Sequence, residues 1–208
     1  MNKHKTEQEM FWAGRFGNDY ISRNDSKKLI AANLNFFDEI FNRTTNVRTI
    51  LELGANIGMN IMAINNLLSN SKTYAVEINS KAFEHLKSVC TGDAYLSSIL
   101  DIEAKIDNQF DFVFTKGVLI HINSDELQKV YEVMYKLSKK YICVAEYYNP
   151  SPMTLEYRGE KNKLFKRDFA GELLDKYKDL ELIDYGFKYR RDNNYPQDDI
   201  TWFLLKKT

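Results

Sequence analysis

The amino-acid sequence predicts an α/β fold with a seven-stranded, mostly parallel sheet and an antiparallel hairpin at its C-terminal end. Short apolar runs alternate with amphipathic segments between residues 47 and 147, and this order is typical of a parallel sheet with helical crossovers. The last third of the chain breaks the alternation, because two apolar-rich runs are joined there by the polar turn RDNNYPQDD. Two strands separated by such a turn favour an antiparallel hairpin.

Each expected element rests on a local pattern. Thr6 followed three residues later by Glu9 resembles a capping box, so a short helix begins there and is broken at Gly14 and Gly17. Val47–Leu53 is apolar on both faces, as a central parallel strand should be. Apolar residues at helical spacing predict the longer helices. The expected elements after the first helix are helix 24–41, strand 47–53, helix 58–68, strand 72–77, helix 80–88, strand 94–98, strand 110–114, helix 123–139, strand 141–147, helix 166–177 and strands 180–190 and 200–206.

Length and charge limit the kind of protein. The chain has 208 residues, so we expect one domain (1–208) made of a helical lid (1–42) and an α/β core (47–208). Its 29 basic residues balance its 29 acidic residues, which argues against a dedicated nucleic-acid binder. Cys90 and Cys143 are far apart and adjoin apolar runs, so we expect reduced core thiols and no metal site.

Two absences in the sequence bear on location. No apolar run reaches the about 18 residues that a membrane span needs, and the start MNKHKTEQEM lacks the apolar core of a signal peptide. We therefore expect a cytoplasmic protein without a membrane partner. The oligomeric state is not indicated by any pattern in the sequence.

The stretch VRTILELGANIGMN, residues 47–60, carries the strongest functional signal. Glu52 ends an apolar strand, Gly54 and Gly58 follow in a loop, and Glu77 ends the next apolar run. A strand, a glycine-rich loop, a helix and an acid about 20 residues later indicate a site for a nucleotide-like cofactor. A P-loop is excluded because no Lys follows Gly58, and the dinucleotide pattern is excluded because its third Gly is missing.

The remaining class is the Rossmann-like fold that binds S-adenosylmethionine (SAM). This class combines an acid-and-glycine loop after the first strand, an acid at the end of the second strand, and a C-terminal antiparallel hairpin. Asn56 stands where the class carries a middle Gly, and Asn adopts a left-handed conformation at modest cost. We therefore expect a SAM-dependent methyltransferase with SAM as its cofactor.

Several further stretches resemble one family over nearly the whole chain. They are FWAGRFGNDYISRN, LELGANIGMN, FTKGVLIHIN, AEYYNPSP, YRGEKNKLFKRDFAGE and DYGFKYRRDNNYPQDDITWFL. Together they look like the methyltransferases associated with pseudaminic acid biosynthesis, a small bacterial family linked to nonulosonic sugar clusters. The resemblance implies the SAM fold and a carbohydrate-type acceptor, either a nonulosonic sugar or its nucleotide conjugate.

The fold class implies where the cofactor contacts lie. Glu77 would accept hydrogen bonds from the paired ribose hydroxyls, and Arg23 would fork to the SAM carboxylate. Ser98 stands near the end of the third strand, where many relatives of the class carry an Asp for the adenine amino group. Aromatic residues of the N-terminal segment would fold over the cofactor, although a purely packing role for them is equally consistent with the sequence. The expected cofactor set is Trp12, Phe16, Tyr20, Arg23, Glu52, Gly54, Ala55, Asn56, Gly58, Asn60, Glu77, Ile78, Ser98, Ile99, Lys116 and Gly117.

The candidate catalytic residues follow the fourth and fifth strands. His121 lies at the carboxyl edge of the sheet, where ligands bind in open α/β folds, and its ordinary pKa range suits a general base. The alternative is a histidine that only packs and shapes the cleft. An oxygen acceptor would need such a base, whereas an amine acceptor would need only to be oriented by Glu146 or a Tyr hydroxyl. The expected catalytic set is His121, Glu146 and Tyr147.

The segment from Glu146 to Arg167 is the candidate acceptor region. EYYNPSP superficially resembles the Asn-Pro-Pro-Tyr motif of nucleic-acid amino methyltransferases, but that motif belongs after the fourth strand, so we reject a nucleic-acid substrate. The basic run near Lys166 fits either a solvated face and helix start or a site for an acidic sugar. The expected acceptor set is Tyr148, Tyr157, Arg158 and Lys166. Two alternatives stay open: another small polar metabolite or glycan as acceptor, or a SAM-binding protein without turnover.

Overall fold

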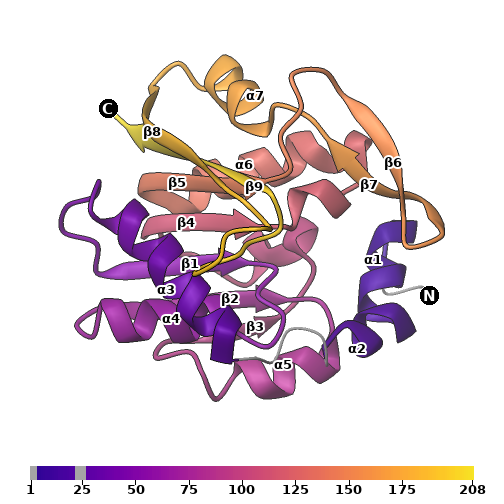
Figure 1. The fold of residues 1–208 in the computed structure, drawn as a ribbon, viewed down its shortest axis with the longest axis horizontal. Coiled ribbons are helices and arrows are strands. Elements are labelled where there is room, and N and C mark those ends of the chain that lie inside the picture. The colour runs from indigo at the N-terminus through magenta and orange to yellow at the C-terminus, as the bar shows by residue number, and fades with distance from the viewer. Residues whose placement is uncertain (1–3, 22–26) are drawn as a thin grey trace.

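A seven-stranded sheet forms the centre of the computed structural model, which describes residues 4–21 and 27–208. The first five strands in spatial order are parallel, and the last two run antiparallel to their neighbours as a C-terminal pair (Figure 1). The predicted fold class is therefore confirmed. In spatial order the strands are β3 (Ala94–Leu96), β2 (Lys72–Glu77), β1 (Thr49–Leu53), β4 (Phe110–Lys116), β5 (Ser138–Glu146), β9 (Ile200–Lys207) and β8 (Leu180–Lys188).

Helices cover both faces of this sheet. On one face α3 (Lys27–Phe41) and α4 (Met59–Leu67) pack against β1 and β4, and α5 (Ser80–Leu86) adjoins α4. On the other face α6 (Leu127–Leu137) and α7 (Phe169–Lys176) share a core cluster with the 3-10 helix η1 (Ile99–Ala104). The central strand β1 is apolar toward both layers, because Ile50, Leu51 and Leu53 are all fully buried.

Two short helices lie outside these layers, at the carboxyl edge of the parallel strands. They are α1 (Glu7–Ala13) and α2 (Arg15–Ile21), and the Thr6 capping box predicted for α1 is present. The expected lid of residues 1–42 is thus too long. The aromatic face of α3 packs on the sheet through Phe36, Phe37 and Ile40, so α3 belongs to the core.

A second hairpin, not expected from the sequence, follows β5. Its strands are β6 (Met153–Tyr157) and β7 (Glu160–Lys166), and they form a separate two-stranded sheet beside α1 (Figure 1). The basic run assigned to a solvated face or a helix start therefore lies on a strand, and α7 begins only at Phe169. The turn consists of Arg158 and Gly159, both with positive φ, which is the type I′ geometry that a two-residue hairpin prefers.

Other boundaries shift by a few residues. The third strand ends at Leu96 because Ser98 caps η1, and β4 continues to Lys116. The helix expected over 123–139 starts with the 3-10 helix η3 (Ser124–Glu126) before α6 begins at Leu127, and a further 3-10 helix, η2 (Leu119–His121), precedes it.

Truncating the core side of α3 should weaken the whole fold. Phe36→Ala removes a fully buried ring beside the sheet and should lower the free energy of unfolding by about 3–5 kcal/mol. Tyr185→Ala, on edge strand β8, removes a ring that is 64% exposed and should change it by about 0.5 kcal/mol or less. Urea unfolding of both variants checks this, and equal losses would contradict the assignment of α3 to the core.

Candidate active site

One cavity of about 260 Å³ lies at the carboxyl edge of the parallel strands. Loops after β1, β2, β3 and β4 form its floor, α1 and α2 form its roof, and the β8–β9 loop closes one side. The structure brings most of the predicted site residues to this one cavity. Those on its wall are Trp12, Tyr20, Gly54, Ala55, Asn56, Asn60, Glu77, Ile78, Ser98, Ile99, Lys116, Gly117, His121, Tyr147 and Tyr157.

The loop after β1 turns sharply under the cavity. Gly54 and Asn56 both have positive φ, at +81° and +50°, so Asn56 adopts the left-handed conformation expected of it. A Cβ on Gly54 would lie 2.7 Å from a methyl carbon of Val118, which explains why only Gly fits there. Gly58 is at the N-terminus of α4 and faces Leu86, so it serves the packing of α4 on α5 and does not line the cavity.

Glu52 lies beneath this loop and is fully buried. Its Oε1 accepts a hydrogen bond of 2.6 Å from the Asn60 side chain. Its Oε2 has no hydrogen-bond partner among the described residues. Burial raises the pKa of Glu52 to about 8, and the Asn60 hydrogen bond and the nearby Lys116 charge only partly oppose this rise. Glu52 does not line the cavity, and at this pKa its side chain is mostly protonated near pH 7, so the unpartnered Oε2 is a hydrogen-bonding group just beneath the cavity floor.

Glu77 connects two loops of the cavity floor. Its Oε2 accepts from the backbone N–H of Asn56 and its Oε1 from that of Asn79, both at 2.7 Å. Burial raises the pKa of Glu77, while these backbone hydrogen bonds oppose the rise. Each carboxylate oxygen retains a second lone pair, so the pair of oxygens can still accept from two hydroxyl groups of a ligand.

The β4 side of the cavity is polar and charged. Lys116 donates to Asn33 Oδ1 over 3.3 Å, and Gln197 donates to the same oxygen over 3.0 Å. Asp198 also lines the cavity here, and burial lowers the pKa of Lys116 while Glu52 and Asp198 oppose that change. Gly117 has a φ of +68°, and a Cβ there would meet no described heavy atom within 4 Å, so its absent side chain leaves open space.

His121 lies on the cavity wall in a nearly buried position. Its Nδ1 is 2.6 Å from the backbone carbonyl oxygen of Lys163 on β7. Because that oxygen can only accept, Nδ1 carries the proton and Nε2 is left as the acceptor nitrogen of the neutral ring. Burial lowers the pKa of His121 to about 4, although the Lys163 hydrogen bond opposes this, so the ring is neutral at physiological pH.

Glu146 has a different environment from the one expected of a catalytic residue. Its carboxylate accepts hydrogen bonds from the backbone N–H groups of Val118, Leu119 and Ile120, at 3.1, 3.1 and 3.4 Å. It is buried behind the loop after β4 and does not line the cavity. Burial raises its pKa to about 7 against the effect of these bonds. Glu146 therefore positions the loop that carries His121.

Aromatic rings from three segments meet above His121. The Trp12 ring of α1 lies 4.6 Å from the His121 ring, and the Tyr157 ring of β6 lies 4.8 Å from it, centroid to centroid. Tyr20 packs on Trp12. Phe16 is stacked on Phe11 and contacts Tyr157, so it supports this cluster without lining the cavity.

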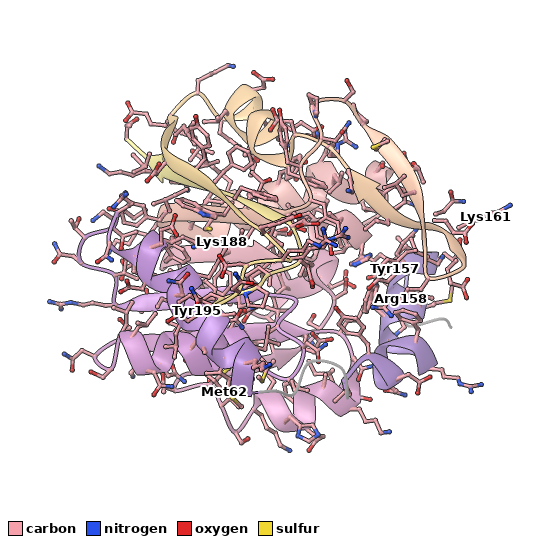
Figure 2. All side chains as sticks on the ribbon, in the orientation of Figure 1. Met62, Tyr157, Arg158, Lys161, Lys188 and Tyr195 are labelled. Carbon is pink, nitrogen blue, oxygen red and sulfur yellow. The ribbon has the colours of Figure 1, made fainter. Side chains whose placement is uncertain are left out.

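The remaining predicted residues are at the rim or away from the cavity. Arg158 lies over the Tyr157 ring at 5.5 Å, and Lys166 lies over the Tyr147 ring at 5.2 Å, so both adjoin cavity residues without lining the wall. Figure 2 shows Tyr157 and Arg158 together near the end of the β6–β7 hairpin above α1. Tyr148 is 42% exposed, contacts Phe203 and does not line the cavity. Arg23 lies outside the described residues.

Several cavity residues were not expected from the sequence. They come from the start of α1, from α3, from the turn before α5, from the η3 segment and from the β8–β9 loop. The loop 189–199 is long for a hairpin connection, and long loops inside compact domains are often functional, so its length was a usable signal. No comparable signal marked the α1 residues. The unexpected polar residues on the wall are Thr6, Gln8, Glu9, Asn33, Asn79, Asn123, Glu126, Gln197 and Asp198.

The described residues form neither a metal-binding cluster nor a membrane-spanning helix. Within residues 4–21 and 27–208, no group of three or more His, Cys, Asp or Glu side chains is arranged to hold a metal ion. In the same residues no helix has the length and apolar character needed to cross a membrane.

Comparison with solved structures defines the fold. Magnesium protoporphyrin IX methyltransferase from Synechocystis, with bound S-adenosylhomocysteine (SAH), matches with a TM-score of 0.68 and 10% identity over 97% of this chain and 100% of that one. The 1,6-didemethyltoxoflavin-N1-methyltransferase of Burkholderia thailandensis, with its substrate and SAH, matches with a TM-score of 0.69 and 14% identity over 93% and 85%. A SAM-dependent methyltransferase from Clostridium acetobutylicum matches with a TM-score of 0.63 and 12% identity over 92% and 97%.

These structures share the fold of class I SAM-dependent methyltransferases, and this chain has that fold. Several of these neighbours were solved with SAM or SAH bound. No protein-family model and no curated protein matches the sequence. Nothing in the comparisons points to the family associated with pseudaminic acid biosynthesis, and the carbohydrate acceptor gains no support from them.

Substitution of Gly54, in the loop after β1, can be compared with substitution of Gly159, which also has a positive φ. Gly54→Ala adds a methyl group that collides with Val118 under the cavity, so affinity for SAH should fall by about tenfold or more. Gly159→Ala, at a φ of +85° with no described atom within 4 Å of its Cβ, is the matched control and should leave the affinity unchanged. Calorimetric titration with SAH measures both, and equal losses would show that left-handed strain alone is responsible.

Proposed function

We propose that this protein is a SAM-dependent methyltransferase that acts on an oxygen or nitrogen of a small polar acceptor, with a carbohydrate-type acceptor as the specific expectation. One observation carries the proposal. The loop of residues 54–57 and the Glu77 carboxylate face a single cavity in a fold whose neighbours hold SAM or SAH at TM-scores above those of chance similarity. The cofactor is supported more strongly than the acceptor.

The residues of the cavity fit SAM. The Glu77 oxygens have lone pairs for the two ribose hydroxyls, and the apolar Ile78 and Ile99 provide a slot for a flat ring. The charged β4 side, with Lys116 and Asp198, suits the amino-acid portion of the cofactor. Bound SAM would supply a methyl group on a sulfonium, which transfers to a nucleophile as the sulfur becomes a neutral thioether.

The chain's own contribution is to align the acceptor, exclude water and receive a proton. His121 is neutral, with Nδ1–H held by the Lys163 carbonyl, so Nε2 can accept the hydrogen of an acceptor hydroxyl. The rings of Trp12 and Tyr157 shield this histidine from water. Glu146 fixes the loop that presents it.

The acceptor proposal rests on the chemistry of the rim. Tyr147, Tyr157, Arg158 and Lys166 combine aromatic faces with positive charge, which suits an acidic sugar or a nucleotide-activated sugar. The family resemblance of the sequence supports the same acceptor class. A second candidate is a flat heteroaromatic acceptor, which the aromatic cluster around Trp12 favours. The toxoflavin precursor of the Burkholderia neighbour is a named example of a heteroaromatic substrate on this fold.

Incubation with methyl-labelled SAM tests the proposed function. The panel should contain free and nucleotide-activated acidic sugars, neutral sugars and flat heteroaromatic compounds. Transfer of label to a sugar supports the proposal, and transfer only to a heteroaromatic compound favours the second candidate. Tight SAM binding without transfer to any compound would favour a binding protein without turnover, and an absence of SAM binding would overturn the proposal.

Replacing His121 tells apart its two possible roles, as a base that accepts a proton and as a residue that only shapes the cavity. His121→Asn retains a side-chain N–H near the Lys163 carbonyl but removes Nε2, so methylation of a hydroxyl acceptor should slow by about 10²–10⁴-fold. SAH affinity should stay within about twofold, because the histidine would act on the acceptor. Single-turnover rates and calorimetry provide the two measurements. A parallel loss of SAH affinity would indicate that His121 only shapes the cleft.

The buried Glu52 should make the ligand-free protein less stable as the pH rises. Its folded pKa of about 8 exceeds the ordinary value of 4.5, so the folded state binds more protons in this window and stability falls with rising pH. The slope is at most about 1.4 kcal/mol per pH unit. Glu52→Gln should therefore show a smaller loss of Tm than wild type between about pH 5 and about pH 8.

Glu84→Gln is the control for this experiment, because the Glu84 side chain is 64% exposed. Its pH profile should match that of wild type. An unchanged profile in Glu52→Gln would show that Glu52 has no raised pKa in the folded protein.

A further inference from the structure

Two buried acceptor atoms on α1 lack partners. Gln8 and Glu9 are 5% and 7% exposed, and both line the cavity. Among the described residues, neither Gln8 Oε1 nor Glu9 Oε1 has a hydrogen-bond partner. Leaving such atoms buried and unsatisfied is costly, so their presence on a cavity wall points to a ligand that donates to them.

The other atoms of both side chains are already engaged, which fixes the chemistry that the cavity sees. Gln8 Nε2 donates to the carbonyl oxygen of Asn162 over 3.1 Å, so its amide oxygen must point elsewhere. Glu9 Oε2 accepts from the backbone N–H groups of Lys5 and Thr6, at 2.6 and 2.8 Å, as the capping box requires. Gln8 and Glu9 therefore offer the cavity two hydrogen-bond acceptors, their Oε1 atoms, and no donor.

Gln8 and Glu9 lie toward the β3 side of the cavity, which differs in character from the β4 side. Lys5, which precedes α1, forms an ion pair with Asp101 of η1, so the start of α1 is attached to the β3 side. That side carries the apolar Ile78, Ile99 and Leu100, whereas the β4 side carries Lys116 and Asp198. A purine ring prefers the apolar side, and the charged amino-acid portion of SAM prefers the other.

Glu126 also lines the cavity near Lys5, but two other polar groups of the β3 side are engaged with protein partners. Asp101 is paired with Lys5, and the hydroxyl of Ser98, the residue expected to serve this purpose, accepts from the backbone N–H of Leu100 over 3.1 Å.

We propose that Gln8 and Glu9 accept hydrogen bonds from the exocyclic amino group of the adenine ring, so that the roof helix α1 reads the base of the cofactor. This inference rests on the proposed SAM cofactor. The two N–H bonds of an aromatic amino group match two neighbouring acceptors. A 6-oxo purine would present an acceptor to these acceptors and would be rejected.

The test compares SAH with S-inosylhomocysteine, which carries oxygen in place of the amino group. Wild-type protein should bind SAH at least about tenfold more tightly in calorimetric titration. In Glu9→Gln, the capping N–H groups require the amide oxygen, so the amide –NH₂ turns toward the cavity in place of an acceptor. The preference for SAH should therefore fall to about onefold or reverse.

Two further variants separate base reading from loss of contact with the hairpin. Gln8→Met keeps the length of the side chain but removes Oε1, and it should lower the preference for SAH by about fivefold or more. Glu7→Gln weakens the ion pair between Glu7 and Lys163 that joins the same helix to the same hairpin, but Glu7 does not line the cavity. This control should retain the wild-type preference, and thermal unfolding of each unliganded variant verifies that it is folded.

The outcomes separate this inference from the proposed function. Equal binding of the two compounds by wild type, or an unchanged preference in Glu9→Gln, would overturn the reading of adenine while leaving a SAM-binding protein. An amino group on the acceptor would then be the donor for these atoms. Absence of SAH binding by folded wild type would instead overturn the proposed function itself.

Discussion

The Glu77 carboxylate is the interaction on which the arrangement of the cavity depends. It is a buried carboxyl group at the end of β2 whose oxygens hold the β1 loop through Asn56 and the turn into α5 through Asn79. The Asn79 side chain then caps α5 and donates to the backbone oxygen of Trp12 and to the side chain of Asn18. One buried group therefore fixes the floor and, through a single neighbour, the position of both roof helices. Its burial is costly, and the backbone hydrogen bonds offset part of that cost.

The β6–β7 hairpin provides the second constraint. Lys163 contributes its backbone oxygen to His121 and its ammonium group to Glu7, while Asn162 contributes its backbone oxygen to Gln8. Roof helix and candidate catalytic loop are thus attached to the same two residues of one strand. In the proposed reaction, the segment nearest the acceptor would also hold the residues that contact the cofactor and the candidate base.

Much of the fold was predictable because it follows from burial. The strands β1, β2 and β4 are mostly buried, and Gly54 and Asn56 have the backbone conformations that their residue types permit. The β6–β7 hairpin was not predicted, since its strands are rich in charge and an Arg occupies the first left-handed position of its turn. Arg158 in that position concealed the signal that Asn-Gly would have given.

Some residues of the candidate site were predictable from local sequence, whereas others depend on tertiary contacts. Residues in the loop after β1 and at the end of β2 were accessible to sequence reasoning, because a glycine-rich turn and a strand-ending acid have local signatures. The sequence predicts a catalytic role for Glu146. Only the tertiary structure shows that its oxygens accept hydrogen bonds from the backbone of the loop after β4. The sequence marks Glu9 only as part of a capping box and gives Gln8 no role. Their importance comes from the residues that α1 faces, and sequence periodicity does not contain that information.

The contact between Lys163 and His121 has an evolutionary consequence. The bond is made by a main-chain oxygen, so it survives any side-chain replacement at position 163 that preserves the strand. The hairpin can therefore vary its outward residues, and with them the molecules it contacts, while the tautomer of the histidine stays constant. A loss of the whole hairpin would remove that constancy together with the rim. Point substitutions in the hairpin would thus change the molecules that the rim contacts and keep the His121 tautomer, whereas deletion of the hairpin would remove both the rim and the contact that fixes the tautomer.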